Sequence, residues 1–179
     1  MKTIKKLGLV LSLAIATILS SCSKDSDGGS SLAIPATGSY INAKIDGADF
    51  TTVIAGQSAA TAVRSGSDVS TSILIGGSSF NMADPSNSKT ISLSLNGITA
   101  TGTYNLNSEN SESMLLYTIK NSTSQITYAT GDCTGANGTV TISSISATKI
   151  EGTFSFTGKD DACTGTKTNT NGTFRGVFQ

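Results

Sequence analysis

The sequence has no histidine and no tryptophan, and these two absences exclude several kinds of site. Without histidine the chain lacks the commonest general base and the commonest metal ligand. Without tryptophan it lacks the best aromatic platform for sugars, bases and quaternary amines. Its many serines have no histidine to activate them, and no Gly-x-Ser-x-Gly motif occurs. We therefore expect a protein that is not an enzyme and that needs no cofactor or metal.

Charged residues are scarce, at 13% of the chain, and they balance at 12 basic and 12 acidic side chains. Three of the lysines (Lys2, Lys5 and Lys6) precede the first apolar run. If that run is removed together with the residues before it, 9 basic and 12 acidic side chains remain. A net charge of −3 gives no electrostatic footprint for nucleic acid or for an anionic membrane surface. We expect no nucleic-acid partner.

The first 22 residues are typical of a targeting segment. A lysine-rich start is followed by a mainly apolar region of thirteen residues, Leu7–Leu19, which is too short to span a membrane. The next residues complete the sequence Leu19-Ser20-Ser21-Cys22, which resembles the lipobox of bacterial lipoproteins. That resemblance implies that residues 1–21 are a signal peptide and that Cys22 receives lipid, which anchors the chain to a membrane. The alternative is an ordinary secretory signal with a chance cysteine.

Residues 22–36 predict a flexible tether behind the lipidated cysteine. Serine and glycine dominate this stretch, and it contains Asp25 and Asp27. Acidic residues at this place resemble the signal that sends some lipoproteins to the outer face of the outer membrane, whereas a soluble linker has a similar composition. We expect an outer-membrane protein, on the cell surface or on the periplasmic face.

Residues 37–179 predict one all-β domain. Apolar residues alternate with polar ones in many short segments, and turn residues recur every 8–12 positions. Asp46-Gly47 and Asn96-Gly97 are both typical of hairpin turns, whereas residues 80–87 and 105–113 read as loops. About nine to ten short strands fit an antiparallel β-sandwich or barrel equally well.

The best-defined hairpin is predicted between Gly138 and Gly158. We set Ile142 opposite Phe154, which places Val140 opposite Phe156 and Gly138 opposite Gly158. Four apolar side chains then share one face of the hairpin.

Cys133 and Cys163 flank this hairpin and remain as a pair once Cys22 is lipidated. Outside the cytoplasm such a pair usually forms a disulfide. A redox-active pair or a zinc site is disfavoured, because no Cys-x-x-Cys spacing and no histidine accompany the cysteines. Three carboxylates lie at the same end of the hairpin, and they are solvated turn residues or the ligands of a calcium ion: Asp132, Asp160 and Asp161.

Three short motifs resemble those of a family of small bacterial lipoproteins with a domain of unknown function, which open with AKIDG followed by Phe and close with GTFSF and NGTF. Here they are Ala43-Lys44-Ile45-Asp46-Gly47 with Phe50, Gly152-Thr153-Phe154-Ser155-Phe156, and Asn171-Gly172-Thr173-Phe174. The resemblance covers about Tyr40 to Phe178. It implies an all-β lipoprotein and transfers no catalytic residue.

These observations predict a lipid-anchored envelope lipoprotein that acts as a monomeric, non-enzymatic binding or interaction module. One alternative is a small-ligand carrier with a cavity inside a β-barrel. The other is an enzyme of unrecognised type, although Glu151 near a hairpin tip is a poor candidate for a glycosidase acid. The four tyrosines are expected to pack on strand faces: Tyr40, Tyr104, Tyr117 and Tyr128.

Overall fold

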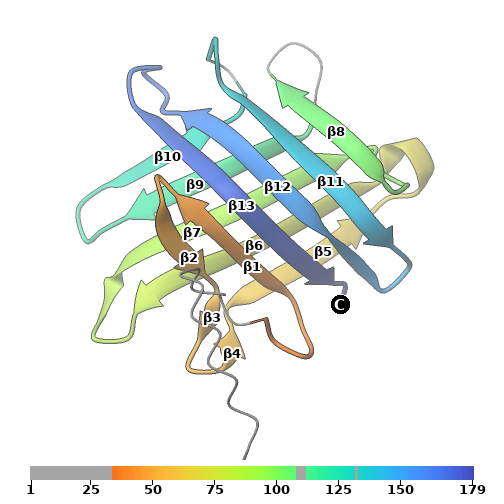
Figure 1. Ribbon diagram of the computed structural model, residues 1–179, viewed down its shortest axis with the longest axis horizontal. Coiled ribbons are helices and arrows are strands. Elements are labelled where there is room, and N and C mark those ends of the chain that lie inside the picture. Colours follow the sequence, from red (N-terminus) through yellow and green to blue (C-terminus); the bar gives the residue numbers. More distant parts are fainter. Residues whose placement is uncertain (1–33, 108–111, 132) are drawn as a thin grey trace, which may run out of the picture. The chain divides into compact units, whose positions relative to one another are not determined.

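Strands make up nearly all of the regular structure (Figure 1). The computed structural model describes residues 34–107, 112–131 and 133–179, and the lipidation residue Cys22 lies outside them. The described part contains the 3-10 helix η1 (Asp68–Ser70) and no α-helix, so the all-β prediction is confirmed. The strands are β1 (Tyr40–Ile45), β2 (Ala48–Thr51), β3 (Val53–Ile54), β4 (Gln57–Ser58), β5 (Ala60–Ser65), β6 (Ser72–Asn81), β7 (Asp84–Asn96), β8 (Gly102–Asn107), β9 (Met114–Lys120), β10 (Gln125–Ala129), β11 (Asn137–Ile145), β12 (Lys149–Lys159) and β13 (Thr166–Val177).

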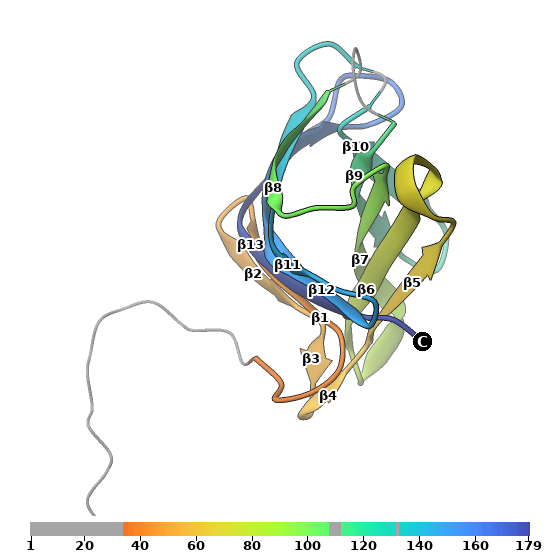
Figure 2. The same ribbon diagram turned by 90° about the vertical axis from the view of Figure 1, so that its right-hand side faces the viewer.

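Eleven of these strands form one antiparallel sheet that folds into two layers (Figure 2). One layer has the order β2-β1-β13-β12-β11-β8, and the other has the order β10-β9-β7-β6-β5. The layers are joined where Ala129 of β10 pairs with Lys159 of β12. On the opposite side, Ala62 of β5 forms an isolated bridge with Phe178. The fold is therefore a sandwich whose two sheets are continuous at one corner.

The core lies between the two layers and is formed by every second residue of the strands. Ile41, Ala43 and Ile45 of β1 and Ile91, Leu93 and Leu95 of β7 belong to one core cluster, and all six are buried. This alternation buries one face of each strand and leaves the other for polar side chains. The interior between the layers holds one continuous cluster of buried apolar side chains.

The turn at Asp46-Gly47 agrees with the prediction. Ile45 pairs with Ala48, and Ala43 pairs with Phe50. Asp46 and Gly47 have φ values of 49° and 83°, and a two-residue hairpin turn of the primed type needs positive φ at both positions.

The predicted register of the β11–β12 hairpin is wrong by two residues. Phe154 pairs with Val140 instead of Ile142, and Ile142 pairs with Gly152. A bulge between Ile142 and Ser144 shifts the register, and alternation alone fixes only which face a residue occupies. Because the error is even, the four apolar side chains still share the buried face, as predicted.

Three predicted connections also differ from the structure. Asn96-Gly97 is not a hairpin turn, because β7 ends there and β8 pairs with β11 in the other layer. The chain crosses between the layers at this point and buries Ile98. Residues 80–87 are not a loop, since β6 and β7 continue into them as a hairpin with an irregular register beside Phe80. The predicted loop at 105–113 begins too early, because β8 extends to Asn107.

Candidate functional site

The outer face of the layer that contains β11, β12 and β13 carries rows of hydroxyl and amide side chains. One row crosses four neighbouring strands, because Thr141 pairs with Thr103 on β8 and with Thr153 on β12, and Thr153 pairs with Thr173 on β13. Asn42 and Thr51 extend this row across β1 and β2. A second row contains Asn105, Thr139 and Ser155. Neighbouring strands lie about 4.8 Å apart, so each row is a closely spaced ladder of polar groups.

Several polar groups in the middle of this face have no partner within the chain. Thr103 and Thr141 share a hydrogen bond with 3.0 Å between their Oγ1 atoms, and the Thr139 hydroxyl donates to Asn105 Oδ1 over 3.3 Å. The side chains of Thr153, Ser155 and Asn171, by contrast, make no hydrogen bond to any residue of the described part. All three are exposed, so their donors and acceptors are open to a molecule from solution.

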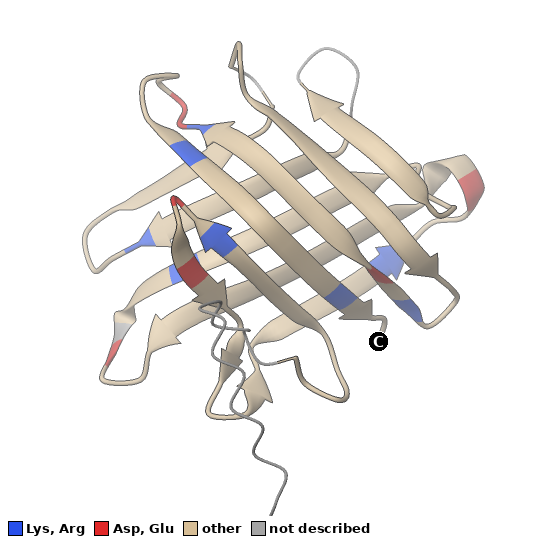
Figure 3. Ribbon diagram, viewed as in Figure 1, with Lys and Arg blue, Asp and Glu red and all other residues tan. Residues whose placement is uncertain are grey.

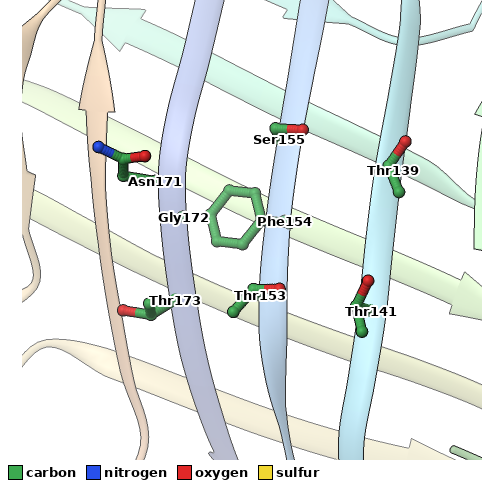
Figure 4. Close-up of a pocket in the computed structure, with 8 residues that line it drawn as sticks. All are labelled: Thr139, Thr141, Thr153, Phe154, Ser155, Asn171, Gly172 and Thr173. Carbon is green, nitrogen blue, oxygen red and sulfur yellow. The ribbon is translucent and has the colours of Figure 1, made fainter. Parts of the chain in front are cut away.

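A groove runs over these unpaired groups (Figure 4). We call it the hydroxyl groove; it has a volume of about 380 Å³. A smaller depression of about 180 Å³ shares Thr139 and Ser155 with it and continues along the same strands. The residues that line the hydroxyl groove are Thr139, Thr141, Thr153, Phe154, Ser155, Asn171, Gly172 and Thr173.

An irregularity in β13 shapes the hydroxyl groove. The pairing of β12 with β13 shifts between Phe154 and Phe156, and Asn171 has a φ of 52°, which is rare for a residue with a side chain. Gly172 leaves room for the ring of Phe154, which lies between β12 and β13 in Figure 4. Asn171-Gly172 therefore belongs to a bulge within one long strand.

Charged side chains lie toward the ends of the strands and leave the middle of this face neutral (Figure 3). At one end Arg175 Nε donates to Glu151 Oε1 over 2.8 Å, and Lys149 Nζ lies 2.9 Å from Glu151 Oε2. Near the other end Lys167 Nζ donates to Asp46 Oδ2 over 2.7 Å. Lys149 and Arg175 share the Glu151 carboxylate and Lys167 is paired with Asp46, while the residues that line the hydroxyl groove between these clusters carry no charge.

Glu151 is unsuited to act as a glycosidase acid. Hydrogen bonds from Lys149 and then Arg175 lower the pKa of its carboxyl group below the usual value. A general acid needs the opposite shift, which burial in an apolar setting produces. The ion pair between Glu151 and Arg175 instead helps to fix the first residues of the domain. Arg175 also donates a hydrogen bond to the Pro35 carbonyl oxygen over 3.0 Å.

Cys133 and Cys163 form the disulfide that the sequence predicts. Their Cα atoms lie 5.6 Å apart, and the bond links the loop before β11 to the loop between β12 and β13. Asp160 lies beside it, and its Oδ1 accepts hydrogen bonds from the backbone N–H groups of Thr164 and Gly165. Its carboxylate therefore braces the loop. Among the described residues, which exclude Asp132, no group of three or more acidic, cysteine or histidine side chains could hold a metal ion.

The four tyrosines pack as predicted. Tyr40, Tyr117 and Tyr128 are buried, and the Tyr104 hydroxyl donates to the Ala100 carbonyl oxygen over 2.9 Å. Burial raises the pKa of the Tyr117 hydroxyl to about 12, with smaller contributions from Asp46 and Tyr128. A phenol in this state stays protonated and serves packing.

A second groove, of about 530 Å³, lies where the β6–β7 and β9–β10 hairpins end. Phe80 and Ile119 supply apolar surface there, and Lys89 and Lys120 supply positive charge. The hydroxyl groove, by contrast, lies over side chains that have no hydrogen-bond partner in the described part of the chain. We therefore take the hydroxyl groove as the candidate site.

Sequence reasoning missed the hydroxyl groove, although its signal was present. Thr139 and Thr141 alternate with Val140 and Ile142, and the apolar members of this pattern were used to find the core. The polar members define the opposite face by the same period of two. The groove itself depends on which strands lie side by side.

Fold and surface together define an all-β sandwich domain with a neutral, polar outer face. Residues 41–178 match the family described as a domain of unknown function (DUF6252), and the chain belongs to that family. The match confirms the domain of unknown function that the sequence motifs predict, over nearly the same residues. Searches of the curated proteins and of the solved structures gave no match. In the described part of the chain, no helix is long and apolar enough to cross a membrane.

Proposed function

We propose that this protein is a lipid-anchored lipoprotein of the bacterial cell envelope whose β-domain is a non-enzymatic binding module. The proposal of a lipid anchor rests on the sequence Leu19-Ser20-Ser21-Cys22 at the end of a short apolar run. The disulfide supports an oxidising location, because such bonds persist mainly outside the cytoplasm. The neutral groove supports binding, since it offers hydrogen-bonding groups and no reactive one.

The anchor is tested by replacing the lipidated residue in the full chain. Cys22→Ser is expected to move the protein from the membrane fraction to the soluble fraction, because two or more acyl chains are needed for stable anchoring and none remains. Immunoblots of separated fractions give the readout. Cys133→Ser is the control, since it removes a cysteine and leaves the lipidation sequence intact. Retention of the Cys22→Ser protein in membranes would refute the anchor.

The side of the outer membrane is tested by adding a protease to intact cells. Cleavage from outside would place the domain on the cell surface and favour a ligand from the surroundings. Protection that ends only when the outer membrane is opened would place it in the periplasm. In both places we propose a monomer that has no nucleic-acid partner, and size-exclusion chromatography with light scattering tests the oligomeric state.

A further inference from the structure

We propose that the hydroxyl groove binds a neutral, hydroxyl-rich chain, that is, an uncharged glycan. This inference rests on the proposed binding role and names the class of ligand. The argument has three steps: the hydrogen-bonding groups that are unpaired, the charge of the surface, and the shape that the groove gives it.

The unpaired polar groups favour a ligand that can both donate and accept hydrogen bonds. Thr153 and Ser155 each present a hydroxyl, and Asn171 presents an amide, with no partner among the described residues. A hydroxyl is donor and acceptor at once, and the amide supplies both functions on separate atoms. Sugar hydroxyl groups have the same dual capacity, so they match this set of groups.

The opposite layer shows that hydroxyl rows on this protein are not always open. There, Ser78 and Thr90 share a hydrogen bond of 2.9 Å, and Thr118 and Thr127 share one of 3.0 Å. Those hydroxyls satisfy each other, whereas Thr153 and Ser155 have no such partner in the described part of the chain. The hydroxyls of Thr153 and Ser155 are therefore open to an external partner.

The uncharged lining of the groove argues against charged ligands. Glu151, Arg175 and Lys149 are paired among themselves at one end, and Asp46 is paired with Lys167 near the other. A nucleotide or an acidic polysaccharide would find no unpaired cation within the groove. An uncharged chain needs no cation in the groove, because its binding affinity comes from hydrogen bonds and apolar contacts.

The shape of the groove fits an extended chain with alternating polar and apolar surface. The groove continues into the smaller depression through Thr139 and Ser155. Each threonine presents a methyl group beside its hydroxyl, and the ring of Phe154 borders the groove at Gly172. Sugar rings carry C–H groups between their hydroxyls, so the methyl groups and the ring can cover the apolar part while the hydroxyls pair.

The test is an array of neutral and acidic glycans probed with the labelled full-length protein in detergent. We expect retention of at least one unbranched neutral glycan, whose affinity is then measured by titration. The double variant Thr153→Val with Ser155→Ala should bind it more than about tenfold more weakly than the wild type, because it loses two hydrogen bonds to the ligand. The single variant Ser155→Ala should show a smaller loss, of about threefold to tenfold.

The matched control is Thr118→Val with Thr127→Val, which removes two hydroxyls from the opposite layer and should leave the affinity unchanged. Thermal unfolding of every variant checks that the fold is intact. Retention of no neutral glycan, retention of acidic glycans alone, or equal affinity of the wild type and Ser155→Ala would overturn the proposal. Fractionation of Cys22→Ser does not involve the groove, so failure of the anchor and failure of the glycan site are distinguishable.

Discussion

At the scale of single residues, the pair Gly172 and Phe154 shows how the core and the groove depend on one position. A Cβ atom on Gly172 would lie 2.5 Å from the Phe154 carbonyl oxygen and 2.7 Å from its ring. The ring itself is 4% exposed and contacts Phe174, with 6.2 Å between the ring centroids. The missing side chain therefore allows an aromatic residue to fill the core at the bulge.

We expect Gly172→Ala to destabilise the domain by about 1–3 kcal/mol, because the added methyl group overpacks the core against backbone. Gly76→Ala is the matched control: its Cβ would meet only the Ser92 hydroxyl oxygen, at 3.7 Å, and should leave stability within about 0.5 kcal/mol. Urea denaturation measures both. Equal stability of the two variants would show that β13 relaxes around the new methyl group and that the close approach is not needed.

At the scale of elements, the disulfide ties together two loops that flank β11 and β12. It joins Cys133 to Cys163 across a sequence separation of 30 residues. Closing a loop of that length restricts the unfolded chain, and the chain-entropy account gives roughly 3.5 kcal/mol of stabilisation.

The double variant Cys133→Ser with Cys163→Ser is therefore expected to lower the free energy of unfolding by roughly 3 kcal/mol. Urea denaturation gives the value, and wild-type protein with a reducing agent is the control that should reproduce it. Peptide mapping without reduction should find one peptide that joins the two cysteines. Two free thiols in that map, or a loss below about 1 kcal/mol, would contradict the stabilising role.

The amino-acid sequence predicts best those turns and strands whose structure is decided by neighbouring residues. Asp46-Gly47 has the residues that a primed hairpin turn needs, and the turn forms. Asn96-Gly97 has similar chemistry, but the chain there crosses to the other layer. Two residues that favour a turn do not determine where the next strand pairs, because long-range packing of Ile98 and β8 decides it.

At the scale of the whole molecule, alternation predicted which residues are buried but not how the strands are ordered. Val140, Ile142 and Phe154 lie in the core as predicted, although their register was wrong. The hydroxyl groove depends on β11, β12 and β13 being neighbours, and β13 comes next to β12 through pairs across the whole length of both strands. A site made of exposed side chains from three strands becomes visible only when that order is known.

The carboxylates of Asp46 and Glu151 link the stability of the whole domain to pH. Asp46 joins the β1–β2 turn to β13: Lys167 Nζ donates to its Oδ2, and the Thr168 N–H donates to its Oδ1. These hydrogen bonds lower the pKa of Asp46 below the usual 3.8, and those from Lys149 and Arg175 lower the pKa of Glu151 below 4.5. Folding therefore favours the deprotonated form of both groups.

A lowered pKa in the folded state stabilises the domain above the pKa of the unfolded chain, and that stabilisation disappears as the pH falls through the lower, folded value. We expect the free energy of unfolding to be steady from pH 7 to about 4.5 and to decrease below it.

In the double variant Asp46→Asn with Glu151→Gln, the decrease between pH 4.5 and pH 3 should be smaller, because two of the titrating groups are gone. Asp161→Asn, which removes an exposed carboxylate with no ion pair among the described residues, should follow the wild-type curve. Urea titrations at each pH provide the measurement, and an unchanged slope in the double variant would mean that these two clusters do not link folding to protonation.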